Sequence, residues 1–161
     1  MATDPLQAKL IEFIEQAVDI RFKFSSVDVN ADPVTLHNSL VSVQEVLSNL
    51  EELLSKSIRA KASLDRRTLR ARSSHQEAWD RAITVTNNRP TLSEYATGKE
   101  KAAEANLATL ESARVVRREE DMLSYAVEAV DIIRLHYYGL DKIRQDLRKR
   151  LDFSQTELFN A

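Results

Sequence analysis

The sequence has no cysteine and, among 161 residues, only two glycines, three prolines and one tryptophan. The missing cysteines exclude disulfides, thiolate metal ligands and a cysteine nucleophile. The scarcity of glycine and proline argues against turn-rich β-sandwiches and barrels. No apolar run approaches the roughly 18 residues of a membrane span, and the N-terminus lacks the layout of a signal peptide. We therefore expect a soluble protein of the cytoplasm without a membrane partner.

The residues that are present predict an all-α fold. The hydrophobic fraction of 43% and the charged fraction of 30% are typical of a folded chain, and the length suits a single domain over residues 1–161. Asp4-Pro5, Asp32-Pro33 and Arg89-Pro90 each precede a helical pattern, since proline is tolerated at the first helical position. The two aspartates can accept hydrogen bonds from the first turn. These junctions predict where helices begin.

Two helices are expected over residues 5–24 and 33–86. In the second, large apolar side chains alternate steps of four and three residues, and this stripe is here called the seam: Leu36, Leu40, Val43, Leu47, Leu50 and Leu54. Such spacing is typical of a coiled coil. Past Ser57 we expect the seam to shift by one residue, to Ile58, Ala62, Leu69, Trp79 and Ile83. The sequence leaves open whether this helix continues past Ser73.

A third helix is expected over residues 99–151, followed by a short docking tail over 152–161. Its predicted seam consists of Ala103, Leu107, Leu110, Leu123, Ala126, Val130, Ile133, Tyr137, Leu140, Leu147 and Leu151. Gly139 lies inside this pattern, which suits a kink or a close helix contact. Short connections make neighbouring helices antiparallel, so we expect an elongated helical hairpin with the first helix as third member of a bundle.

The charges are distributed unevenly along the chain. Residues 1–55 carry three cations and nine anions, whereas residues 56–89 carry nine cations and three anions. Five of these cations fall within an arc of about 100° on one helix face and form a basic stripe: Lys56, Arg59, Arg66, Arg67 and Arg70. Such a stripe suits phosphates or an acidic protein partner.

An internal use of the basic stripe is an equally good interpretation. In a hairpin that turns near residue 89, two residues lie opposite each other when their residue numbers add to about 178. Glu119, Glu120 and Asp121 would then lie near Lys56, Arg59 and Lys61 and form an ion-pair belt. Nucleic acid is a partner that we consider but do not favour, because no aromatic side chains interleave with the stripe.

Nothing in the sequence predicts catalysis, a cofactor or a metal site. His37, His75 and His136 lie far apart, without the spacing of metal ligands. There is no glycine-rich phosphate loop and no nucleophile elbow. We therefore expect no catalytic, cofactor-binding or metal-binding residues and a protein that is not an enzyme.

Apolar side chains that lie off the seam predict association with other chains. A hairpin cannot cover them all, and uncovered apolar surface usually marks an interface. Trp79 is expected to plug the core near the hairpin tip or, alternatively, to dock on a partner. Phe153, Leu158 and Phe159 are candidate docking residues on the tail. We expect a homo-oligomer or a subunit of a larger protein assembly.

About 90 residues of the second half resemble the recombination mediator family of T-even phages, whose members form rings and bind single-stranded DNA. The residues that carry this resemblance are Lys61, Arg66, Arg67, Arg70, Arg72, Tyr95, Lys99, Glu100, Ala129, Asp131, Ile133, Arg134, Ile143, Leu147 and Arg148. The chain departs from that family at residues 135–139. The resemblance implies a mediator that binds single-stranded DNA and a recombinase.

Two functions are thus predicted from the sequence. The leading prediction is a non-catalytic, self-assembling helical protein, a virion or assembly subunit of a phage, located in the host cytoplasm or incorporated into the virion. The alternative is the recombination mediator, which would use the basic stripe.

Overall fold

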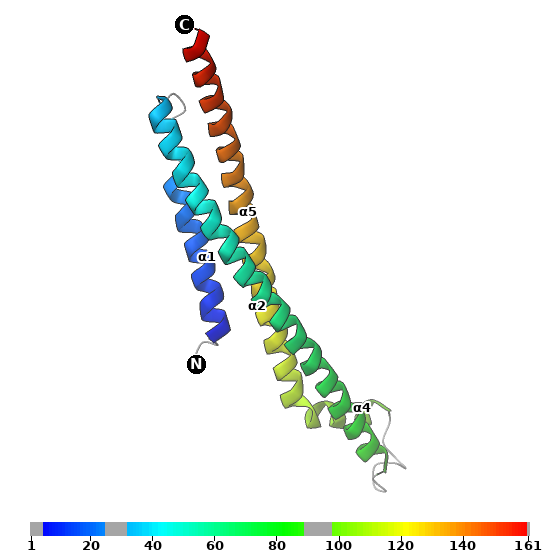
Figure 1. The fold of residues 1–161 in the computed structure, drawn as a ribbon. Helices are drawn as coiled ribbons and strands as arrows, with labels where there is room; N and C mark the ends of the chain where they lie inside the picture. The colour runs from blue at the N-terminus through cyan, green and yellow to red at the C-terminus, as the bar shows by residue number, and fades with distance from the viewer. Residues whose placement is uncertain (1–4, 25–31, 89–97, 161) are drawn as a thin grey trace. The chain divides into compact units, whose positions relative to one another are not determined.

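A computed structural model describes residues 5–24, 32–88 and 98–160. These residues form the helices α1 (Pro5–Phe24), α2 (Pro33–Asn88), α4 (Gly98–Ala108) and α5 (Leu110–Asn160), which Figure 1 shows. The described ranges contain no strand, so the all-α fold is confirmed. None of the described helices is long and apolar enough to cross a membrane.

The contacts divide the chain into two compact units. The first unit comprises residues 1–60 and 125–161, and the second comprises residues 61–124. Both α2 and α5 contribute to each unit, so the two units share their longest helices. The single domain that the sequence predicts stays a prediction, and the units are described separately below.

Asp32 caps the N-terminus of α2, as the sequence predicts. Its carboxylate oxygen Oδ1 accepts hydrogen bonds from the backbone N–H groups of Val34 and Thr35, at 2.9 and 3.0 Å. The Thr35 hydroxyl donates to Oδ2 at 2.7 Å. These bonds, led by that of the Thr35 backbone, hold the pKa of Asp32 below its ordinary value. Pro33 and Pro5 are the first residues of their helices. Asp4 and Arg89-Pro90 lie outside the described residues.

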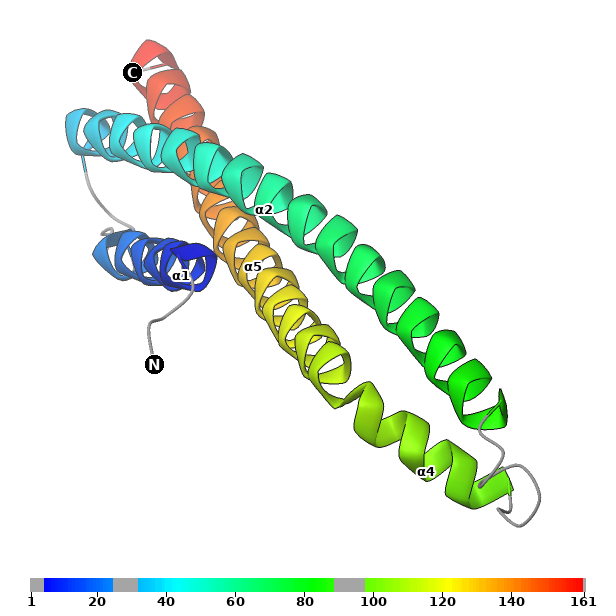
Figure 2. The ribbon, with the colours of Figure 1, turned by 90° about the horizontal axis from the view of Figure 1, so that it is seen from below.

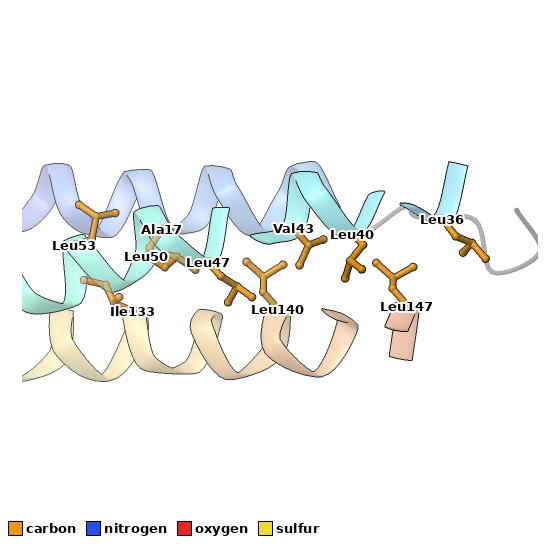
Figure 3. Packing of buried hydrophobic residues seen from close by; sticks show 10 residues of the cluster. All are labelled: Ala17, Leu36, Leu40, Val43, Leu47, Leu50, Leu53, Ile133, Leu140 and Leu147. Atoms are coloured by element: carbon orange, nitrogen blue, oxygen red, sulfur yellow. The ribbon is translucent and has the colours of Figure 1, made fainter. Parts of the chain in front are cut away.

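The core of the first unit is the predicted leucine seam. Leucine and valine side chains of α2 point toward α5 and α1, and Figure 3 shows them between the helices: Leu36, Leu40, Val43, Leu47, Leu50 and Leu53. Ile133, Leu140 and Leu147 meet them from α5, and Ala17 from α1. All are buried, and each fully buried leucine stabilises the fold by roughly 1.5–3 kcal/mol. Along this core α2 and α5 run antiparallel (Figure 3).

The helix ends differ from the sequence predictions at three places. α2 ends at Asn88 rather than at residue 86. It has 56 residues, or roughly 84 Å at 1.5 Å per residue, and it continues past Ser73, which the sequence leaves open. The predicted third helix is divided at Thr109 into α4 and α5, as Figure 2 shows. Hydrogen bonds of 3.0 Å still bridge the division, from Thr109 N to Ala105 O and from Ala113 N to Thr109 O. The predicted tail over 152–161 is wrong, because α5 continues to Asn160 through a stretch without glycine or proline.

The predicted shift of the α2 seam past Ser57 is wrong at its first three residues, whereas Trp79 and Ile83 are half-buried. Ile58 and Leu69 are 42% and 58% exposed, and Ala62 is exposed as well. Ser57, Leu64 and Thr68 are buried instead. These three positions continue the steps of three and four from Leu50, because an unbroken helix keeps the same face toward its neighbour. Ser57 and Thr68 are small and polar although they lie on the seam. A prediction based on large apolar residues therefore selects the wrong face of the helix.

The same error affects the predicted seam of α4 and the start of α5. Leu107 and Leu110 are 74% and 46% exposed, and Ala103 is exposed too. Ala105, Thr109 and Glu119 are buried at the positions that continue the spacing from Ala126. From Ala126 onward, five of the predicted seam residues are buried: Ala126, Val130, Ile133, Leu140 and Leu147.

Gly139 makes no close contact with another helix within the described residues. It lies inside α5, and a Cβ atom added there would meet nothing within 4 Å. A close helix contact at Gly139 is therefore absent within the described chain, and the predicted kink stays a prediction.

Candidate functional site

A layer of polar and charged side chains crosses the second unit between α2 and α5. Arg67 Nη2 donates to Glu119 Oε1 at 2.6 Å, and the Glu119 side chain is only 12% exposed. The Thr68 hydroxyl lies 3.0 Å from the carbonyl oxygen of Leu64 and 3.2 Å from that of Glu119. Charged and polar groups at seam positions fix the register of a coiled coil. This polar layer therefore defines which residues of the hairpin face each other.

Two further contacts belong to the polar layer. Arg72 donates from Nε and Nη2 to Glu120 Oε1, at 2.9 and 2.7 Å. His75 Nδ1 lies 2.8 Å from the Ser112 hydroxyl oxygen, and that hydroxyl donates to Thr109 O at 2.8 Å. Because the single hydroxyl proton of Ser112 is used in this way, the Nδ1 of His75 is the donor in their contact.

The register differs from the sequence prediction. The opposed pairs Thr68–Glu119 and His75–Ser112 add to about 187, not 178. α2 ends at Asn88 and α4 begins at Gly98, so the centre of the hairpin lies near position 93 rather than 89. The cross-hairpin ion pairs do form. Their cations are Arg67 and Arg72, and the predicted pairing with Lys56, Arg59 and Lys61 is wrong.

The basic stripe is partly used by internal pairs. Lys56 binds Glu52 on its own helix at 2.7 Å, and Arg67 binds Glu119. Arg59, Arg66 and Arg70 are exposed and make no ion pair with any residue that the structure describes. The Nε of Arg66 donates only to the backbone oxygen of Ala62, at 3.2 Å. Three cations of the stripe thus remain open to an anionic partner.

The candidate docking residues have different surroundings. Phe153 is 67% exposed on α5, whereas Trp79 is half-buried in the second unit. The side chains of Leu158 and Phe159 lie outside the described residues. Leu135 and Tyr138, which are 63% and 67% exposed on α5, are not among the docking residues predicted from the sequence. Their spacing of three residues on the face opposite the seam is the signal that would have found them.

Tyr137 and Tyr138 have opposite roles although they are adjacent. The Tyr137 hydroxyl donates to Glu51 Oε1 at 2.8 Å, which joins α5 to α2 and raises the pKa of Tyr137 above its ordinary value. The rings of Tyr137 and Tyr138 meet edge to face, with centroids 5.9 Å apart. Tyr137 is therefore part of the internal packing, and Tyr138 presents its ring outward.

A groove of about 360 Å³ lies between α1 and α2 in the first unit. Asp19, Glu52 and Lys56 contribute its charged groups. Within the described part of the chain, no group of three or more histidine or acidic residues could hold a metal ion.

Comparisons with models of known protein families, with curated proteins and with solved structures find no match to this chain. The functional argument therefore depends on the chain's own surfaces.

Proposed function

We propose that this protein is a non-catalytic helical protein that self-assembles or joins a larger assembly through protein–protein contacts. The role that fits the predicted phage resemblance is a structural or accessory subunit of a phage, present in the host cytoplasm or in the virion. The observation that carries the proposal is a set of large apolar side chains on the outer faces of helices whose inner seam is already filled.

The outer apolar side chains occur in both units. In the first unit they include Leu135, Tyr138 and Phe153, and in the second Leu69, Leu107 and Leu110. None of these is needed to complete the core, because buried residues of the same helices already fill it. Apolar side chains grouped on a surface usually mark an interface with another protein.

Sedimentation velocity of the full chain over a range of concentrations tests this function. We expect a sedimentation coefficient that rises with concentration, and native mass spectrometry should show masses of two or more chains. A monodisperse monomer at every concentration would contradict self-assembly.

The second candidate function is the single-stranded DNA-binding recombination mediator. Arg59, Arg66 and Arg70 favour it, because they are exposed on α2 without an acidic partner among the described residues. Paired N–H donors of arginine suit phosphates. Each neutralised phosphate of a single strand adds about 0.7 to the salt slope, which is the fall in the logarithm of the binding constant per unit of the logarithm of salt concentration. The proposed mediator would then load a recombinase on the strand that it binds.

A salt titration of binding to a single-stranded oligonucleotide tests the mediator function. For a mediator, replacing Arg66 and Arg70 by alanine should weaken binding and lower the salt slope by about 1.4. Lys61→Ala is the matched control, since Lys61 is exposed on α2 about 140–180° away from those two arginines. Absence of binding near physiological salt would contradict the mediator and leave the assembly protein.

A further inference from the structure

A second stripe runs along the outer face of α5, opposite the seam. Its members recur in steps of three and four residues, and all are exposed: Glu128, Asp131, Leu135, Tyr138, Lys142, Gln145 and Lys149. This outer stripe lies within the first unit. Its spacing is that of a coiled-coil seam, so it can pack against one further helix.

The centre of the outer stripe is apolar and unobstructed. Leu135 and Tyr138 are both more than 60% exposed, although they flank Tyr137, which is bonded to Glu51. Gly139 adjoins Tyr138, and a Cβ added at Gly139 would meet nothing within 4 Å. A glycine there leaves room beside the tyrosine ring for the close approach of another backbone. Tyrosine at the centre of a small interface is a typical anchor.

The charges of the outer stripe are separated by this apolar centre. Glu128 and Asp131 lie on its N-terminal side, and Lys142 and Lys149 lie on its C-terminal side. Two acids and two bases give the stripe no net charge, so it selects neither a polyanion nor a polycation. A helix that complements it must carry bases opposite the acids and acids opposite the bases.

The same stripe, turned end for end, meets that requirement for the two charges nearest its apolar centre, Asp131 and Lys142, and places Glu128 opposite Gln145. When two copies of α5 lie antiparallel with opposed positions adding to 273, Leu135 faces the Tyr138 of the second copy and Asp131 faces its Lys142. A two-fold axis repeats both contacts, as in the closed dimers that most homo-oligomers form. In a parallel pair, Asp131 would face Asp131 and Lys142 would face Lys142, which is repulsive.

We propose that the outer stripe of α5 binds the outer stripe of a second copy of this chain, antiparallel and around a two-fold axis. This inference rests on the proposed self-assembly and names the partner and the surface. A contact along one helix is smaller than a standard interface of about 1,600 Å², so the dimer is expected to be weak and reversible.

Charge exchange tests the pairing in the full-length protein by sedimentation equilibrium. Asp131→Lys and Lys142→Glu should each weaken dimerisation at least tenfold, because each places like charges opposite one another. The double variant D131K/K142E should dimerise within about threefold of the original protein, and so should an equal mixture of the two single variants. Tyr138→Ser should also weaken the dimer at least tenfold.

The matched control is Val115→Ser, which removes an exposed apolar side chain from α5 within the second unit. It should leave the dimerisation constant unchanged, and circular dichroism should show unchanged helicity for every variant. Should the original protein associate while the exchanges have no effect, the outer stripe is the wrong surface and the proposed function stands. A protein that stays monomeric at all concentrations overturns both the pairing of the outer stripes and the proposed self-assembly.

Discussion

Arg67 donates a hydrogen bond of 2.6 Å to the carboxylate of Glu119, a residue 52 positions further along the chain. The pair lies between α2 and α5 in the second unit, where Leu64, Thr68, Ala105 and Thr109 are buried. Apolar side chains of similar size could slide past each other by one turn, whereas a partly buried charged pair has one good arrangement. We interpret the pair as the residues that fix the register of the hairpin.

Replacing Glu119 by alanine is expected to lower the free energy of unfolding by about 1–3 kcal/mol, because Arg67 then stays partly buried without this partner. The double variant R67M/E119L should recover most of this loss, because it removes both charges together. It also removes Glu119 Oε2, which is buried and accepts no hydrogen bond from the described residues. Urea unfolding followed by circular dichroism measures both effects.

Glu120→Ala is the control for this measurement. Glu120 pairs with Arg72 in the same layer, but their side chains are 40% and 59% exposed. Its loss should lower the free energy of unfolding by less than about 1 kcal/mol. Equal effects at Glu119 and Glu120 would contradict the distinction between a buried and a surface pair.

The position of the seam in the second unit is tested by two leucines of α2. Leu64 is fully buried, so Leu64→Ala should lower the free energy of unfolding by about 2–5 kcal/mol. Leu69→Ala removes the same atoms from an exposed position and should change it by no more than about 0.5 kcal/mol. A larger loss of stability for Leu69→Ala than for Leu64→Ala would mean that the seam lies on the face predicted from the sequence.

The cap at Asp32 predicts a dependence of stability on pH. Hydrogen bonds from Thr35 and Val34 lower its pKa in the folded state, so the ionised carboxylate stabilises α2 above the unfolded value of about 3.8. That stability is lost as the pH falls through the lower, folded pKa. Asp32→Ala should therefore lower the Tm at pH 7 and have little effect below both pKa values. Asp32→Asn keeps a capping oxygen without a titrating group, and should lower the Tm less at pH 7.

Gly139 offers a stabilising substitution. Because a Cβ would meet nothing within 4 Å, Gly139→Ala should raise the free energy of unfolding by about 0.5–1 kcal/mol. Gly98→Ala is the control at the first residue of α4, where the gain should be smaller. A loss of stability at Gly139 would mean that the helix is packed more tightly there than the structure shows.

The sequence predicts the first unit better than the second for a physical reason. From Leu36 to Leu50 the seam positions are also the large apolar ones, so spacing and hydrophobicity agree. Beyond Ser57 they disagree, and hydrophobicity favours Ile58 and Leu69, which are exposed. Continuing the count of three and four would have found Leu64 and Thr68, because an unbroken helix keeps its face.

Local sequence patterns could not predict the register of the hairpin or the exposure of the outer stripe. Which residues oppose each other depends on how many residues separate the end of α2 from the start of α4. The sequence pattern does not give that number. The seam count places Tyr137 toward the other helices, but the exposure of Tyr138 depends on which sides of α5 those helices cover, and local spacing does not give that.

The most direct test of self-assembly through α5 is the distance between nitroxide labels in a dimer, measured by pulsed electron resonance. The chain has no cysteine, so Lys149→Cys provides a single labelling site on the outer stripe. With opposed positions adding to 273, residue 149 lies 12.5 positions from the two-fold axis, and the labels should be about 40 Å apart at 1.5 Å per residue. A distance below about 20 Å would indicate a parallel pair, and no dipolar coupling would mean that α5 does not join two chains.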